Sequence, residues 1–279
     1  MIKITADSTC DLSQHLLETY NISMSPLHIV VDEETFDDGV TITPTDIFRL
    51  IGQESKNVST AAVNVFEYET FFSSFATEYE AIIHFSLGSH FSSSHQNAKI
   101  AAQNFPNVYV IDTNNLTTGS GYMILQAAQL AKEGKNVEEI ILQTKSIIDK
   151  ISVSFVVPTM EYLLKGGRCT MLEAIGATLL KIKPSIILEN GQLVVGTKYR
   201  GSLDKVIEKY IGDLFVDVDS IDTGTLFITT AHCSEEMINK IKEVTASYVT
   251  FENIYVTTAG CTVSTHCGPN TFGLIFKTK

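Results

Sequence analysis

The sequence predicts an α/β protein of two domains: an N-terminal domain with a mainly parallel sheet and helices on both faces, and a smaller mixed α/β domain. In the first half, apolar β-rich runs alternate with helical patterns, as in βαβ units. In the second half, Asn190-Gly191 stands between two apolar runs, a strong signal for a hairpin with antiparallel pairing. We divide the 279 residues into domains 1–150 and 151–279, a soft boundary because no linker marks it.

The elements of the first domain follow from apolar runs and helix-start signals. The expected strands are Ile2–Ala6, Pro26–Val31, Ala81–Leu87 and Val108–Asp112. Residue pairs spaced as capping boxes are Asp11 with Gln14, Asn64 with Glu67, and Ser93 with Gln96. These pairs predict one helix that ends at about Tyr20, one that ends at about Tyr79 and one that begins after Ser93. Thr43-Pro44 opens another helix with proline at its first position, and two more are expected over Gly121–Glu133 and Val137–Lys150.

The second domain has more strands and a hairpin. Its expected strands are Ser152–Val157, Pro184–Leu188, Leu193–Thr197, Thr225–Thr230, Ile254–Thr258 and Phe272–Lys277. Its expected helices are Met160–Leu164, Leu172–Lys181, Leu203–Phe215 and Glu235–Ser247. The segment 265–270 is interpreted as a turn.

The charge balance excludes some classes of partner. The chain carries 20 Lys and Arg against 32 Asp and Glu, a net charge of −12, and no Lys/Arg run. This argues against nucleic acid and against anionic membrane surfaces. No apolar run approaches the roughly 18 residues of a membrane span, so we expect no stable membrane insertion. An anionic ligand would need local hydrogen-bond donors, because the overall field would repel it.

The cysteines indicate a reducing compartment. Their number is odd, their spacing is irregular, and the opening residues lack the apolar region of a signal peptide: Cys10, Cys169, Cys233, Cys261 and Cys267. We therefore expect free thiols and a cytoplasmic location. No paired C-x-x-C motif occurs, so we expect no metal, and no cofactor motif is found.

Hydroxyl-rich segments at expected strand ends are the first candidate site. Asp7 and Ser8 follow the first strand, at the edge where open α/β sheets bind ligands. Ser59 and Thr60 precede a capped helix and could donate to an anion, although such residues are also common in turns. The stretch 86–95 places several serines between a strand and a helix start, which suits one carboxylate or phosphate.

Basic and histidine-containing segments of the second half are the other candidates. Lys165-Gly166-Gly167-Arg168 and Arg200 add positive charge, which could meet a phosphate or an acidic partner, although glycines also simply end helices. His266 follows Thr265 in the expected turn. A hydrolase using Ser92, His266 and Asp7 is an alternative, weakened because no G-x-S-x-G elbow exists.

Six segments in this order resemble the DegV family of bacterial fatty-acid-binding proteins. The matching residues are Asp7-Ser8-Thr9 with Asp11-Leu12, then Ser59–Val63, Phe91–His95, Leu163–Arg168, Lys181–Pro184 and His266–Gly273. The similarity runs through essentially the whole chain. Three segments depart from the family pattern, at Ala61-Ala62, at Ser93-Ser94-His95 and at Asn270.

The resemblance implies a two-domain carrier that holds one long-chain fatty acid and performs no chemistry itself. It implies that Ser59, Thr60, Ser92 and His266 bind the carboxylate, with supporting loops at Asp7, Ser8, Ser93 and Gly268. A separate fatty acid kinase would phosphorylate the carboxylate to an acyl phosphate for phospholipid synthesis. Arg168 and Arg200 would face that partner. A serine/histidine hydrolase or a phosphotransfer enzyme using Ser92 and His266, and a scaffold with an empty pocket, remain open alternatives.

Overall fold

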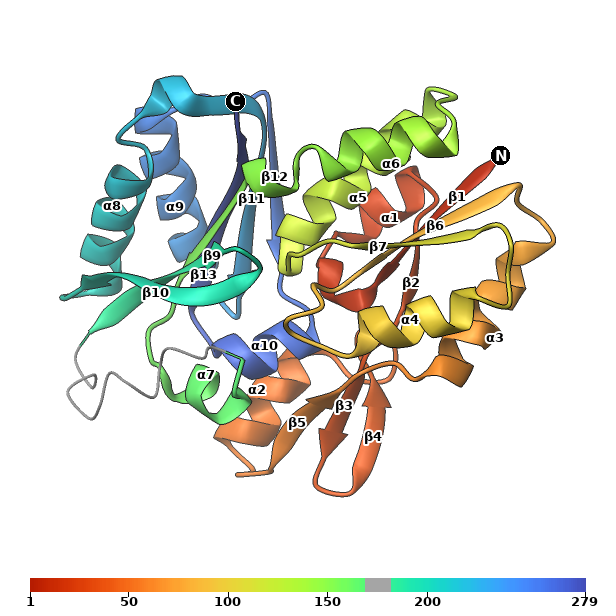
Figure 1. Ribbon diagram of the computed structural model, residues 1–279. Helices are drawn as coiled ribbons and strands as arrows, with labels where there is room; N and C mark the ends of the chain where they lie inside the picture. The colour runs from red at the N-terminus through yellow and green to blue at the C-terminus, as the bar shows by residue number, and fades with distance from the viewer. Residues whose placement is uncertain (169–181) are drawn as a thin grey trace.

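The strands form three sheets that meet around a central region (Figure 1). The computed structural model describes residues 1–168 and 182–279. The expected helix over Leu172–Lys181 lies outside the described residues.

The first sheet is parallel, as predicted. Its strands, in sheet order, are β2 (Ser23–Ser25), β1 (Ile2–Asp7), β6 (Ala81–Ser86) and β7 (Val108–Asp112). Helices α3 (Val65–Ala76) and α4 (Ser94–Ala102) pack on one face. Helices α1 (Gln14–Thr19), α5 (Thr117–Lys132) and α6 (Val137–Lys145) belong to the core of the other face. The prediction of a parallel sheet with helices on both faces is therefore confirmed.

The second sheet is mixed and contains the predicted hairpin. In sheet order its strands are β10 (Gln192–Tyr199), β9 (Lys183–Glu189), β8 (Ile151–Val156), β13 (Thr271–Thr278), β11 (Ile221–Ala231) and β12 (Asn253–Thr258). Only β11 and β12 run parallel within this sheet of described strands. Helices α8 (Leu203–Leu214) and α9 (Glu235–Tyr248) pack in its core on one side. The confirmed class is thus a mixed α/β region in the second half.

Helix α5 lies between these two sheets and is almost wholly buried. Its core cluster joins Ile83 and Phe85 of the parallel sheet to Phe227 and Ile275 of the mixed sheet. The strands of the parallel sheet all precede residue 150 and those of the mixed sheet all follow it. The division into 1–150 and 151–279 remains a prediction, since one hydrophobic cluster spans both parts.

The third sheet is small, antiparallel and only partly predicted. Its order is β4 (Glu34–Asp37), β3 (His28–Val31) and β5 (Val58–Ala61), and α2 (Pro44–Gly52) packs with it. Neither β4 nor β5 is among the expected strands, because each has only four residues and β4 is rich in polar side chains. Two further short helices approach this region, α7 (Glu161–Gly166) and α10 (Cys261–Cys267).

Several predicted helix starts need correction. Ser13, not Asp11, caps α1 by accepting a hydrogen bond from the Leu16 amide. The side chain of Ser93 makes no cap at α4. Helix α5 begins at Thr117, four residues before the expected start, and α6 ends at Lys145. The Asn64–Glu67 capping box is confirmed.

The remaining expectations about the chain concern thiols and membranes. Cys10, Cys233, Cys261 and Cys267 are free thiols, and Cys169 is not described. In the part of the chain that the structure describes, no helix has the length and apolarity needed to cross a bilayer.

A buried carboxylate provides a test of this packing. Asp11 accepts hydrogen bonds from Thr117 Oγ1 (2.6 Å) and from the Gly260 amide (2.9 Å). Burial nevertheless raises the pKa of Asp11 from 3.8 to about 8, since the hydrogen bonds only partly offset the loss of hydration. The folded state therefore holds a proton on Asp11 that the unfolded state releases between these two values.

We expect the free energy of unfolding to fall, relative to an Asp11→Asn variant, as pH rises from about 4 to about 8. The slope approaches 1.4 kcal/mol per pH unit for one group. The amide of asparagine can still accept from Gly260 but does not ionise. Denaturant unfolding of both proteins across this pH range measures the difference. A difference that stays constant with pH would contradict the account.

Candidate functional site

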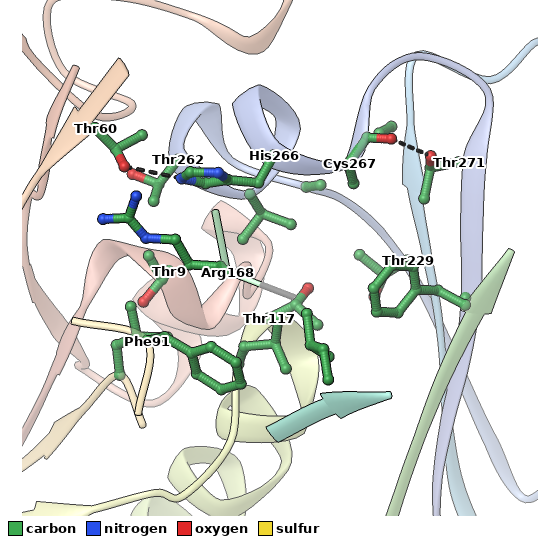
Figure 2. A pocket seen from close by; sticks show the side chains of 18 of the residues that line it. Thr9, Thr60, Phe91, Thr117, Arg168, Thr229, Thr262, His266, Cys267 and Thr271 are labelled. Carbon is green, nitrogen blue, oxygen red and sulfur yellow. Dashed lines mark hydrogen bonds between the residues drawn. The ribbon is translucent and has the colours of Figure 1, made fainter. Parts of the chain in front are cut away.

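One cavity lies where the three sheets meet helices α5, α7 and α10 (Figure 2). The space between its walls is about 930 Å³, including the part open to solvent. Much of the wall is aliphatic or aromatic, with Leu27, Leu87, Phe91, Leu116, Phe155, Leu163, Leu193, Val263 and Ile275. Polar side chains also line it, including Thr60, Ser92, Arg168, Thr262 and His266. Such a cavity suits a ligand with a long apolar body and a polar end.

Thr60 and His266 form a hydrogen-bonded pair in the cavity wall (Figure 2). Thr60 Oγ1 and His266 Nε2 are 2.9 Å apart. Ser59 and Thr60 occupy successive positions of strand β5, and successive side chains of a strand point to opposite faces. Thr60 consequently lines the cavity, whereas Ser59 is exposed and is not among the lining residues.

The imidazole of His266 is neutral near pH 7. Burial, with the nearby positive charge of Arg168, lowers its pKa to about 4. When the proton sits on Nε2, His266 donates to Thr60, and the Thr60 hydroxyl proton is then available to a ligand. Nδ1 is buried and has no hydrogen-bond partner in the protein. A neutral His266 therefore acts as a hydrogen-bonding group and is a weak base.

Two glycines allow α7 and α10 to approach each other around His266. A Cβ atom at Gly166 would lie 2.0 Å from His266 Nδ1. A Cβ atom at Gly268 would lie 2.4 Å from the Tyr162 ring, and Gly268 has a φ of +78°. The predicted supporting role of Gly268 thus corresponds to a close contact between the end of α10 and helix α7.

Ser92 lines the cavity at the start of helix α4. Its Oγ accepts a hydrogen bond from the Ser94 amide (3.1 Å) and lies 2.9 Å from Ser94 Oγ. When Ser94 Oγ is the donor in this pair, the Ser92 hydroxyl proton can point to a ligand. Ser93 is exposed and does not line the cavity, so its predicted supporting role is not reflected in a contact with the site.

Asp7 and Ser8 support the cavity from behind its wall and do not line it. Asp7 accepts hydrogen bonds from Tyr68 Oη (2.5 Å) and from the Leu87 amide (2.7 Å). Ser8 Oγ accepts from the Leu27 amide (3.1 Å). Since Leu27 and Leu87 are lining residues, both polar side chains fix parts of the wall.

This arrangement does not form the serine hydrolase triad considered above. His266 is hydrogen-bonded to Thr60, whereas Ser92 is bonded to Ser94. The carboxylate of Asp7 is bonded to Tyr68 and Leu87 and lies 3.3 Å from His84 Nε2. No carboxylate among the described residues orients His266 through Nδ1.

Two buried aspartates that sequence reasoning did not assign to the site hold helix α10 in place. Asp38 accepts from the amides of Cys261 (2.7 Å) and Thr262 (3.1 Å) and from Ser8 Oγ (3.2 Å). Asp11 accepts from Gly260, just before the helix. Nothing in the sequence connects Asp38 to residues more than 200 positions away. These contacts position His266 opposite Thr60.

The two candidate arginines differ in position. Arg168 lines the cavity and is exposed, so its guanidinium marks an end of the cavity near the surface. It donates a hydrogen bond to the Gly166 carbonyl (2.8 Å). Arg200 is also exposed, after β10, and is not a lining residue.

Among the described residues, no group of three His, Cys, Asp or Glu side chains is placed to hold a metal ion. Burial raises the pKa of Cys10 and of Cys267 to about 12 and that of Cys233 to about 11. These thiols are therefore protonated at neutral pH.

Solved structures share this fold over the whole chain. A DegV family protein from Thermus thermophilus, described by its fatty acid binding, is 27% identical with a TM-score of 0.91, covering 100% of this chain and 99% of that one. DegV from Bacillus subtilis, described as a fatty acid binding protein, is 25% identical with a TM-score of 0.86 over the same shares. A stearic acid-binding protein from Eubacterium ventriosum is 25% identical with a TM-score of 0.84, covering 99% and 98%.

Sequence comparison agrees with the structural likeness. A DegV domain-containing protein of Caldanaerobacter subterraneus subsp. tengcongensis is 30% identical over 282 aligned positions, which span this whole chain and 99% of the relative. The family model described as "Uncharacterised protein, DegV family" matches residues 1–279. With motifs, fold and full-length matches in agreement, this chain belongs to the DegV family.

Proposed function

We propose that this protein binds one long-chain fatty acid, with its acyl chain in the apolar part of the cavity and its carboxylate at the polar end. The observation that carries the proposal is the hydrogen-bonded Thr60–His266 pair. Together with Ser92 and Arg168, this pair lines a cavity that is otherwise largely apolar. The fatty acid binding described for relatives of the same fold supports it.

Burial of the acyl chain supplies most of the binding free energy. Each CH₂ group transferred from water contributes roughly 0.8 kcal/mol. The carboxylate must keep hydrogen bonds to avoid the cost of an unpaired buried charge. The hydroxyls of Thr60 and Ser92 can donate to it, and the exposed guanidinium of Arg168 adds positive charge at the same cavity. These local donors offset the net charge of −12.

The protein acts in this proposal as a carrier for a separate fatty acid kinase, which phosphorylates the presented carboxylate to an acyl phosphate for phospholipid synthesis. Arg168 supports this, because it both lines the cavity and reaches solvent. Arg200 is a second exposed cation available to the kinase. The free thiols of the four described cysteines support a cytoplasmic location, where disulfides are rare.

Removing either donor hydroxyl should weaken binding of hexadecanoate. We expect Thr60→Val and Ser92→Ala each to raise the Kd about tenfold, because a hydrogen bond to a charged group contributes about 1.5 kcal/mol or more. Matched controls are Ser59→Ala and Ser93→Ala, whose exposed side chains neighbour the two donors. Titration calorimetry measures the affinities. Equal affinities in all four variants would remove Thr60 and Ser92 from the head-group site.

The close contact at Gly166 gives a second test. Alanine there would collide with His266 Nδ1, so we expect Gly166→Ala to displace the imidazole and lower hexadecanoate affinity several-fold. In a double variant with His266→Ala, the added methyl group should cost nothing further. Gly52→Ala, where no atom lies within 4 Å of the added Cβ, is the control. A Gly166→Ala protein that binds normally and melts at a higher temperature would show that this contact does not constrain His266.

Ester hydrolysis separates the carrier from the hydrolase alternative. We expect the wild-type protein to hydrolyse p-nitrophenyl hexanoate no faster than a His266→Ala variant, because a histidine with a pKa of about 4 is a poor general base at neutral pH. The release of p-nitrophenol measures the rate. Turnover that depends on both Ser92 and His266 would favour the enzyme.

A further inference from the structure

Two buried threonine hydroxyls in the cavity wall have no hydrogen-bond partner in the protein. They belong to Thr9, which is 1% exposed, and Thr262, which is 6% exposed. Both residues line the cavity. Among the described residues, the buried side-chain atoms without partners are Thr9 Oγ1, His84 Nε2, Thr245 Oγ1, Thr262 Oγ1 and His266 Nδ1. Three of these five residues therefore line one cavity.

Other hydroxyls of the same wall are bonded within the protein. Thr60 is paired with His266, Ser92 with Ser94, Thr117 with Asp11, Thr229 with Thr118 and Thr257, Thr230 with the Thr257 carbonyl, and Thr271 with the Cys267 carbonyl. Thr9 and Thr262 differ from this set. A buried hydroxyl without a partner costs about 1–3 kcal/mol, which a ligand with acceptor atoms recovers.

One carboxylate brings the two threonines to the same part of the wall. Asp38 Oδ2 accepts from Ser8 Oγ, next to Thr9, and from the backbone amide of Thr262. Thr262 also precedes His266 by four positions in α10, and residues with that spacing lie on the same face of a helix. Figure 2 shows Thr9, Thr60, Thr262, His266 and Arg168 bordering the cavity.

The carboxylate of a fatty acid has capacity for both hydroxyls. An ionised carboxyl group offers about four lone-pair sites and only accepts hydrogen bonds. Thr60 and Ser92 each carry a single hydroxyl proton, so they fill at most two of these sites. An alkyl chain offers no acceptor. Asp11, which lies behind this wall, is protonated at neutral pH and adds no negative charge.

We infer that Thr9 and Thr262 are head-group ligands, whose hydroxyls donate to the carboxylate of the bound fatty acid together with Thr60 and Ser92. This inference rests on the proposed function. It deepens that function, because it makes the cavity selective for an acid over a neutral lipid of the same length. Asp38 holds the backbone of Thr262 and the side chain of Ser8, the neighbour of Thr9, before the ligand arrives.

The test compares hexadecanoate with hexadecanol in Thr9→Val and Thr262→Val variants. Valine keeps the shape of threonine and removes the hydroxyl. We expect each variant to bind hexadecanoate about tenfold more weakly and hexadecanol within twofold of the wild-type affinity. Thr262→Ser, which keeps the hydroxyl, should restore acid binding. Thr245→Val is the matched control, since the Thr245 hydroxyl is likewise buried without a partner but does not line the cavity.

The outcomes separate this inference from the proposed function. Two results would overturn the role of Thr9 and Thr262 while wild-type binding stands. The variants could lose affinity equally for hexadecanoate and hexadecanol, or they could keep full affinity for hexadecanoate. A gain in affinity for hexadecanoate would show that the hydroxyls face the acyl chain, which also overturns it. A wild-type protein that binds neither ligand would instead overturn the proposed function. Thermal melting of each variant confirms that the fold is retained.

Discussion

The candidate site depends on the attachment of helix α10 to the N-terminal half of the chain through buried carboxylates. Asp38 accepts the first amides of the helix, and Asp11 accepts the amide of Gly260 just before it. Each contact joins residues separated by more than 200 positions. Because α10 carries Thr262 and His266, these two aspartates determine where the polar wall contributed by the C-terminal half meets Thr60.

The cavity is a consequence of three sheets meeting without complete filling by side chains. Helix α5 separates the parallel sheet from the mixed sheet, while α10 packs against the small third sheet. The space left between them has an aliphatic and aromatic wall, with hydroxyls, one neutral imidazole and one exposed guanidinium among its polar groups. This combination holds an anion by hydrogen bonds and leaves most of the ligand to apolar contact.

The sequence was sufficient to predict the sheets whose strands are mostly long and apolar. Alternation predicted the parallel sheet, and Asn190-Gly191 predicted the β9–β10 hairpin. The small third sheet was not predicted as a sheet, because β4 and β5 have four residues each and partly polar sequences. The interpretation of 265–270 as a turn was wrong for the end of helix α10, whose residues Thr262, Val263, Ser264 and Thr265 have low intrinsic helix propensity.

The candidate site was predicted in its parts but not in its geometry. The resemblance implied that Thr60, Ser92 and His266 bind the carboxylate and that Arg168 faces a partner, and all four line one cavity. Strand pleating turns Ser59 to solvent, which a loop assignment could not foresee. Thr262 would have been found with His266 had the helix been recognised, from its spacing of four. Contacts such as Asp38 with Cys261 depend on the tertiary fold and leave no local signal.

The most direct test of the account is to extract the purified, undenatured protein with organic solvent and identify the extract by mass spectrometry. We expect a long-chain fatty acid in a near-stoichiometric amount, or its uptake when the protein is incubated with fatty acids. An extract that stays empty after such incubation would contradict the central claim that this cavity binds a fatty acid.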